Sequence, residues 1–117
     1  MATKLIEKIP FTSTDLEIWK WSNLQLNDDG AILEFPRLAD RTVQVYGTFG
    51  ASGHLFIEGT NEILSPTWAP LNDPQGEVLD FATAKIKQIL ENPLAIRPRV
   101  TNGDGTTSLT VVIICRG

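Results

Sequence analysis

The stretch over residues 41–71 reads RTVQVYGTFGASGHLFIEGTNEILSPTWAPL, and it decides the fold class. Apolar and polar residues alternate over residues 43–49, and the alternation returns over residues 54–59. A period of two is typical of a β-strand that buries one face. The glycine-rich residues 50–53 indicate a turn between the two segments. The stretch therefore predicts two strands paired as a hairpin.

A lone hairpin cannot bury its apolar face, so the rest of the chain must supply a second sheet. Trp68 follows the hairpin and precedes Leu71, a position from which a large aromatic side chain can hold two sheets together. We therefore predict that Trp68 belongs to the core.

Upstream, LEIWKW over residues 16–21 is the first clear strand, and it places Trp19 and Trp21 on one face. So much aromatic surface is either part of the core or a surface that binds a partner. The NDDG sequence at residues 27–30 predicts a hairpin turn, and residues 31–35 predict a short strand that ends at Pro36.

Downstream, residues 94–101 and 108–116 read as strands, and NGDG at residues 102–105 predicts a hairpin between them. Both faces of the last strand are apolar over residues 111–114, which predicts a central or doubly covered strand. Residues 82–91 fit a short helix and a strand equally well. The full pattern predicts an all-β fold, an antiparallel β-sandwich or jelly roll of about seven or eight strands.

The length of 117 residues suits one domain, which we place at residues 14–117. Residues 1–13 show no strand or helix period and contain Pro10, so we predict an N-terminal arm. Ile6, Ile9 and Phe11 are its apolar residues. We predict that they contact a partner; the alternatives are docking on the edge of this domain or a frayed terminus.

The composition excludes several classes of protein. A formal net charge of −4, with 14 acidic and 10 basic residues, argues against nucleic-acid binding, which needs clustered cations. No apolar run approaches the roughly 20 residues of a membrane span, and residues 1–10 do not resemble a signal peptide. The single cysteine, Cys115, excludes an internal disulfide and favours intracellular folding.

No catalytic constellation is visible. His54 is the only histidine and Cys115 the only cysteine, too few for a zinc site or a supported catalytic triad. Carboxylates at residues 28, 29, 73, 77 and 104 lie in turn sequences, where calcium binding and ordinary turn formation use the same residue types. We expect no enzymatic activity, no cofactor and no metal.

Arg97 and Arg99 lie two residues apart, so both project from one face of a strand. Pro98 between them cannot donate a ladder hydrogen bond, which places it at an edge or against an unpaired side. We predict that the two arginines contact an acidic partner surface; the alternative is a solvated face. Arg116 extends this basic strip if the last two strands pair.

Two blocks, GHLFIEGTNE…PTWAPL and IRPRVTNGDGTTSLTVVI, carry a resemblance to known families. They resemble the discoidin-type, galactose-binding-like jelly roll, and also small decoration or cement proteins of tailed bacteriophages. The resemblance covers roughly residues 42–116. It implies fold-defining rather than catalytic roles for Ile57, Glu58, Gly59, Asn61, Trp68, Ile96, Arg97, Pro98 and Gly105.

The resemblance implies a non-enzymatic virion protein that binds and reinforces a capsid. Its partner would be the major capsid protein or another virion protein, and a homo-oligomer is the expected form. Such a protein would reside in the virion after assembly in the host cytoplasm. The alternative is a carbohydrate-binding module that stacks a glycan on Trp19, Trp21 or Trp68. The chain lacks the cysteine pair of secreted discoidin modules, which favours the virion interpretation.

Overall fold

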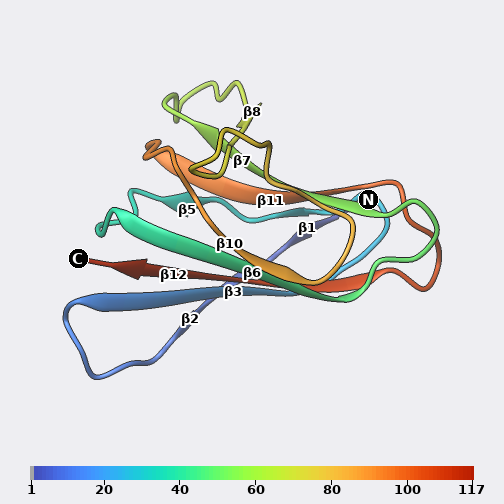
Figure 1. Cartoon of the computed structure of the whole chain (residues 1–117), viewed down its shortest axis with the longest axis horizontal. Coiled ribbons are helices and arrows are strands. Elements are labelled where there is room, and N and C mark those ends of the chain that lie inside the picture. The colour runs from blue at the N-terminus through green and yellow to red at the C-terminus, as the bar shows by residue number, and fades with distance from the viewer. Residues whose placement is uncertain (1) are drawn as a thin grey trace.

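The computed structural model describes residues 2–117, which form two β-sheets packed face to face (Figure 1). No helix occurs among these residues, so the predicted all-β sandwich is confirmed. The five-stranded sheet has the order β10 (Lys85–Gln88), β6 (Asp40–Thr48), β12 (Ser108–Arg116), β3 (Leu16–Leu24) and β2 (Ile6–Ile9).

The seven-stranded sheet is built around two long antiparallel strands, and short strands extend it on both sides. Five of the 12 strands span only two residues, and the other seven fit the predicted number. The order of the sheet is β1 (Thr3–Lys4), β4 (Asp29–Gly30), β11 (Ala95–Thr101), β7 (His54–Thr60) and β8 (Ala69–Pro70), with β5 (Leu33–Glu34) beside β11 and β9 (Asp80–Phe81) beside β7.

The core lies between the two sheets and follows the alternation of the sequence. Val43 and Val45 of β6 point inward and are fully buried, as are Leu55 and Ile57 of β7. The strand β12 lies between β6 and β3, so the prediction of a central last strand is confirmed.

Three predicted hairpins contain the expected turn, but the two strands that each turn connects lie in different sheets. The strands β6 and β7 do not pair; the turn between them carries the chain from one sheet to the other. The connections from β3 to β4 and from β11 to β12 also cross between the sheets. Each is therefore an arch. Glycine, asparagine and aspartate allow the chain to reverse, but they do not decide whether the next strand stays in the same sheet.

The three arches gather at one end of the sandwich, on the right in Figure 1, which we call the arch end. The backbone N–H of Asn102 donates a hydrogen bond to Asn27 Oδ1 at 3.1 Å. The backbone N–H of Ala51 donates to Asp104 Oδ2 at 2.9 Å. Side chains of two arches thus satisfy the backbone of their neighbours, which fixes the three turns relative to one another.

The N-terminal segment differs from the predicted arm because it contains two strands. The strand β1 pairs in parallel with β4 in one sheet, and β2 pairs antiparallel with β3 in the other. The backbone N–H of Ala2 also donates to Asp28 Oδ1 at 2.8 Å. Residues 2–9 therefore cross the side of the sandwich and connect its two sheets.

The ambiguous segment at residues 82–91 contains a strand and no helix. Lys85–Gln88 form β10, which pairs antiparallel with β6 at the edge of the five-stranded sheet. Lysine on an edge strand opposes pairing with another chain.

Within residues 2–117, no helix has the length and apolar character needed to span a membrane.

Candidate interaction surfaces and a pocket at a buried arginine

Trp21 belongs to the core, which corrects its assignment as a partner-binding residue. Its side chain is fully buried, and its Nε1 donates a hydrogen bond to the backbone oxygen of Ala31 at 2.9 Å. Trp19 is partly buried and packs against the same core. Lys8 Nζ lies 5.3 Å from the centre of the Trp19 ring. Of the two alternatives for these tryptophans, the core alternative therefore holds for Trp21.

Trp68 is not a core residue, so that prediction is wrong. It immediately precedes the short strand β8 and is only half-buried. The guanidinium carbon of Arg97 lies 4.4 Å from the centre of its ring, which is cation–π geometry. The long connection after β7 carries Trp68 onto the outer face of the seven-stranded sheet rather than between the sheets.

Arg97 and Arg99 lie on that outer face and are paired within the chain. Both donate to Glu58 of the neighbouring strand, from Arg97 Nε at 3.1 Å and Arg99 Nε at 2.9 Å. Arg97 also lies 3.4 Å from Asp29. We call Phe56, Glu58, Trp68, Arg97 and Arg99 the arginine strip.

The strip explains two sequence features. Pro98 falls between the short partners of β11, because β5 pairs at Ala95 and Ile96 and β4 pairs at Arg99. Pro98 therefore has no ladder partner on that side of β11, one of the two placements predicted for it. Arg116 does not extend the strip, since β12 belongs to the other sheet.

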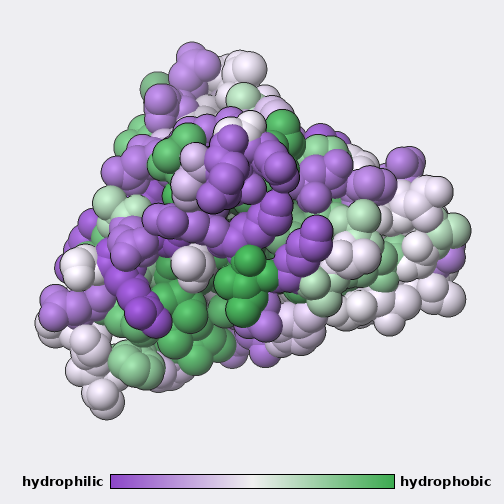
Figure 2. Space-filling model, viewed as in Figure 1, coloured by the Kyte–Doolittle hydropathy of each residue, from purple (hydrophilic) through white to green (hydrophobic). Residues whose placement is uncertain are grey.

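The outer face of the five-stranded sheet carries a row of isoleucines. The strand register places Ile9 opposite Ile18, and Ile18 opposite Ile114. All three side chains are half-buried although they point away from the core. Figure 2 shows apolar side chains gathered in the lower part of the view, where this sheet lies. We call Ile9, Ile18 and Ile114 the isoleucine row.

The remaining predicted residues of the N-terminal segment divide between the two sides of the sheet. Ile6 lies opposite Trp21 and packs against the core. Phe11 follows β2 and keeps 57% of its surface exposed. The three apolar residues therefore do not form one contact surface, and only Ile9 and Phe11 are placed to meet a partner.

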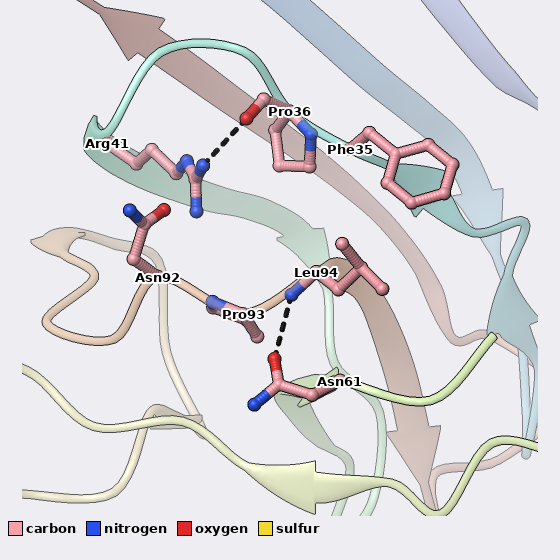
Figure 3. Close-up of a pocket in the computed structure, with 7 residues that line it drawn as sticks. All are labelled: Phe35, Pro36, Arg41, Asn61, Asn92, Pro93 and Leu94. Carbon is pink, nitrogen blue, oxygen red and sulfur yellow. Dashed lines mark hydrogen bonds between the residues drawn. The ribbon is translucent and has the colours of Figure 1, made fainter.

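A pocket of about 480 Å³ opens between the connection from β5 to β6 and the connection from β10 to β11 (Figure 3). The backbone N–H of Phe35 donates to the oxygen of Leu94 at 2.8 Å, and the N–H of Leu94 donates to Asn61 Oδ1 at 3.0 Å. The lining consists of apolar side chains, two amides and one cation: Phe35, Pro36, Arg41, Asn61, Asn92, Pro93 and Leu94.

The cation is Arg41, and it is only 2% exposed. Its Nε donates to the oxygen of Leu38 at 2.8 Å, and its Nη2 to the oxygen of Pro36 at 3.0 Å. Its Nη1 is buried and has no hydrogen-bond partner among residues 2–117. The sequence analysis missed this residue. The available signal was its position, which shares the inward register of Val43 and Val45.

The carboxylates in turns bond both within their own turns and to other segments of the chain. Asp28 Oδ2 accepts the N–H of Gln25 at 2.8 Å, and Asp73 Oδ1 accepts the N–H of Gln75 at 2.9 Å. No cluster of three or more histidine, cysteine, aspartate or glutamate side chains suited to a metal occurs in the described part of the chain. His54 is half-buried, and its Nδ1 lies 2.7 Å from Asp80 Oδ1.

No protein-family model and no curated protein sequence matches this chain. Among solved structures, the SPBc2 prophage-derived protein YomS is similar, with a TM-score of 0.64 at 11% identity over 92% of this chain and 100% of that chain. Weaker matches are NMB1881 from Neisseria meningitidis and Peruvianin-I, a cysteine peptidase from Thevetia peruviana latex.

The two weaker matches support no argument about fold. NMB1881 has a TM-score of 0.41 at 11% identity over 95% of this chain and 83% of that chain. Peruvianin-I has a TM-score of 0.44 at 13% identity over 87% of this chain and 51% of that chain. The chain thus has an all-β, two-sheet fold structurally similar to that of a prophage-derived protein.

Proposed function

We propose that this chain is a non-enzymatic structural protein of a phage particle, and that it binds another virion protein. The observation that carries the proposal is the likeness to the prophage-derived protein YomS, which spans 92% of this chain and all of the other. The sequence resemblance to phage decoration proteins points in the same direction. The proposed partner is the major capsid protein, and the proposed form is a homo-oligomer in the virion.

The isoleucine row is the surface that best fits a protein partner. Ile9, Ile18 and Ile114 come from three adjacent strands and form an apolar band on an outer sheet face. The three side chains are half-buried, and contiguous apolar surface of this kind on an outer sheet face is typical of protein interfaces. The arginine strip fits a partner less well, because Glu58 already accepts hydrogen bonds from both of its arginines.

The carbohydrate-binding alternative has weaker support than the sequence alone suggested. Trp21 is buried, and Arg97 lies against the ring of Trp68. A glycan array with the purified protein tests this alternative directly.

The first test asks whether the protein is part of the particle. Particles of the phage that encodes the chain are purified on a density gradient and probed with antibodies against the protein. We expect it to co-migrate with intact particles in a fixed ratio to the capsid protein. Its presence in infected cells but absence from purified particles would contradict the proposal.

The second test locates the interface. Ile114→Lys places a charge in the isoleucine row, whereas Ser65→Lys adds the same charge to an exposed loop beyond the seven-stranded sheet. We expect Ile114→Lys to fold yet to lower incorporation into particles by about tenfold or more, because burying an unpaired charge is costly. Ser65→Lys should be incorporated like the wild type. Equal incorporation of both variants would remove the isoleucine row from the interface.

A further inference from the structure

The pocket beside Arg41 contains a positive charge that forms no ion pair with any residue among 2–117. Arginine stays protonated at any physiological pH. The Arg41 guanidinium donates to two backbone oxygens and lies near the neutral thiol of Cys115, and no ion pair involving it occurs among the described residues. Its Nη1 is also buried and has no hydrogen-bond partner among the described residues. A buried charge without a counter-ion is costly, which makes the site receptive to an anion.

Cys115 does not supply the missing negative charge. It lies opposite Arg41 in the register of β12 and β6, and it is fully buried. Burial raises the pKa of the Cys115 thiol, although the Arg41 guanidinium acts in the opposite direction. The thiol therefore stays neutral near pH 7.

The lining indicates which anion fits. Phe35, Pro36, Pro93 and Leu94 give the pocket apolar walls, and Arg41 is the only cation among the seven lining residues. One guanidinium and neutral walls match a singly charged group with an apolar neighbour better than they match a doubly charged phosphate. A carboxylate also matches the planar fork of a guanidinium.

We infer that this pocket binds a carboxylate that carries an adjacent apolar group. The carboxylate accepts the free N–H groups of Arg41 Nη1, and the apolar group rests on Phe35 and Leu94. Phe35 lines the pocket and keeps 58% of its surface exposed, so part of its ring is available to a ligand. The ligand is either a small organic acid or the C-terminus of a peptide, since both provide this chemistry.

Asn92 is the lining residue whose amide lies beside the Arg41 guanidinium at the mouth of the pocket (Figure 3). The Asn92 residue is exposed, and its side chain forms no hydrogen bond within the described chain. It can therefore move aside at little cost and let a carboxylate reach Nη1.

The binding test uses a matched pair of probes. N-acetyl-leucine carries a carboxylate beside an apolar side chain, and N-acetyl-leucine amide lacks only the charge. Each is titrated into nitrogen-15-labelled protein, and the signals of Arg41 Nε–H and the Leu94 and Asn61 amides are followed by NMR. We expect saturable shifts with the acid and none with the amide. No saturable shift with the acid, or equal shifts with both probes, would overturn the inference.

Variants at Asn92 keep the inference testable if changes at Arg41 impair folding. Asn92→Asp places a carboxylate beside Arg41, so it should weaken binding of N-acetyl-leucine by about tenfold or more. Asn92→Ala only clears the mouth and should bind at least as well as the wild type. Equal weakening by both variants would contradict the inference. Arg41→Gln, if folded by circular dichroism, should abolish the shifts.

A second arm identifies the source of the carboxylate. A tetrapeptide that ends in leucine with a free C-terminus is compared with N-acetyl-leucine. Tighter binding of the peptide assigns the pocket to a protein C-terminus, and equal binding assigns it to a small acid. Either outcome supports the carboxylate site, and neither depends on the proposed place of the chain in a phage particle.

Discussion

Glu58 is the residue on which the arginine strip depends. It is only 5% exposed, and each of its two carboxylate oxygens accepts a hydrogen bond from a different arginine. Arg97 and Arg99 are more exposed, at 21% and 38% of their side chains. The strip is therefore a partly buried charge network, and its stability depends on keeping the single carboxylate paired.

Replacing both arginines should destabilise the protein. On a solvated face, Arg97 and Arg99 would contribute little to the stability of the free protein. The structure implies a loss of about 2–3 kcal/mol in the free energy of unfolding, because Glu58 is left buried and unpaired. Urea denaturation measures the change. Arg116→Ser, an exposed arginine on the other sheet, should change it by about 0.5 kcal/mol or less. Equal effects would show that Glu58 does not need its partners.

The tryptophans at 21 and 68 should differ in their contribution to stability. Trp21→Ala opens a cavity in the core and leaves the oxygen of Ala31 without its donor, so we expect a loss of about 3–5 kcal/mol. Trp68→Ala removes a half-exposed ring and one cation–π contact, so we expect about 1 kcal/mol. Urea denaturation of the two variants checks the order, and a larger loss for Trp68→Ala would contradict it.

The sequence predicted some of the residues at the candidate interaction surfaces and missed others. Its periodicity correctly predicted the inward faces of β6 and β7, and it placed Arg97 and Arg99 on the same face of one strand. It could not place Trp68, because that residue lies outside any long strand and a long connection sets its position. Arg41 was overlooked because an arginine in an inward register looks like the polar end of a strand.

The strands β1 and β2 show how far a short element can depend on its neighbours. Ile6–Ile9 have weak strand character by themselves, yet the open edge of β3 provides a partner for them. Pro10 then ends the ladder after Ile9, because proline has no N–H to donate. The sequence indicated where this element stops and left docking on the edge of this domain as an alternative, but it did not predict a strand.

Deleting residues 1–9 should destabilise the fold, not only weaken assembly. The deletion exposes the edge of β3 and removes Ile6 from its packing near Trp21. We expect a lower urea midpoint and a greater tendency to aggregate, since an unpaired edge recruits other chains. Phe11→Ser is the control, because that side chain is 57% exposed and should leave the midpoint unchanged. A wild-type midpoint for the truncated chain would mean that the segment acts only as an arm.

Asp104 should make the arch end sensitive to pH. Hydrogen bonds from the Thr106 side chain, from the Ala51 backbone and from the Thr106 backbone hold the pKa of this carboxyl below its ordinary value of 3.8. A carboxyl whose pKa is lowered by folding stabilises the protein above its unfolded pKa. That contribution is lost as the pH falls through the folded pKa.

The test compares the thermal midpoints of the wild type and Asp104→Asn between about pH 7 and about pH 2. We expect the variant to melt at a lower temperature at about pH 7 and the difference to shrink as the pH falls below about 4. Parallel curves down to about pH 2 would show that the ionised carboxylate does not support the arches.

At the scale of the whole molecule, the sequence predicted the sandwich and the central place of β12 correctly. It failed on the sheet to which each strand belongs. A turn sequence reports a reversal of the chain over a few residues, whereas the choice of sheet depends on strands far away in sequence. The likeness to YomS also lies in the overall fold and not in the local sequence, since the two chains are only 11% identical.

The three arches have a consequence for how the chain can fold as it is synthesised. The arches send consecutive strands into different sheets, so β3 and β6 do not pair with the strands that follow them. Both pair instead with β12, which is synthesised later. Until the ribosome releases residues 108–116, the five-stranded sheet lacks its middle strand. A chain truncated before that point would expose the edges of β3 and β6 and would be open to aggregation and proteolysis. The five-stranded sheet can therefore be completed only after residues 108–116 have left the ribosome.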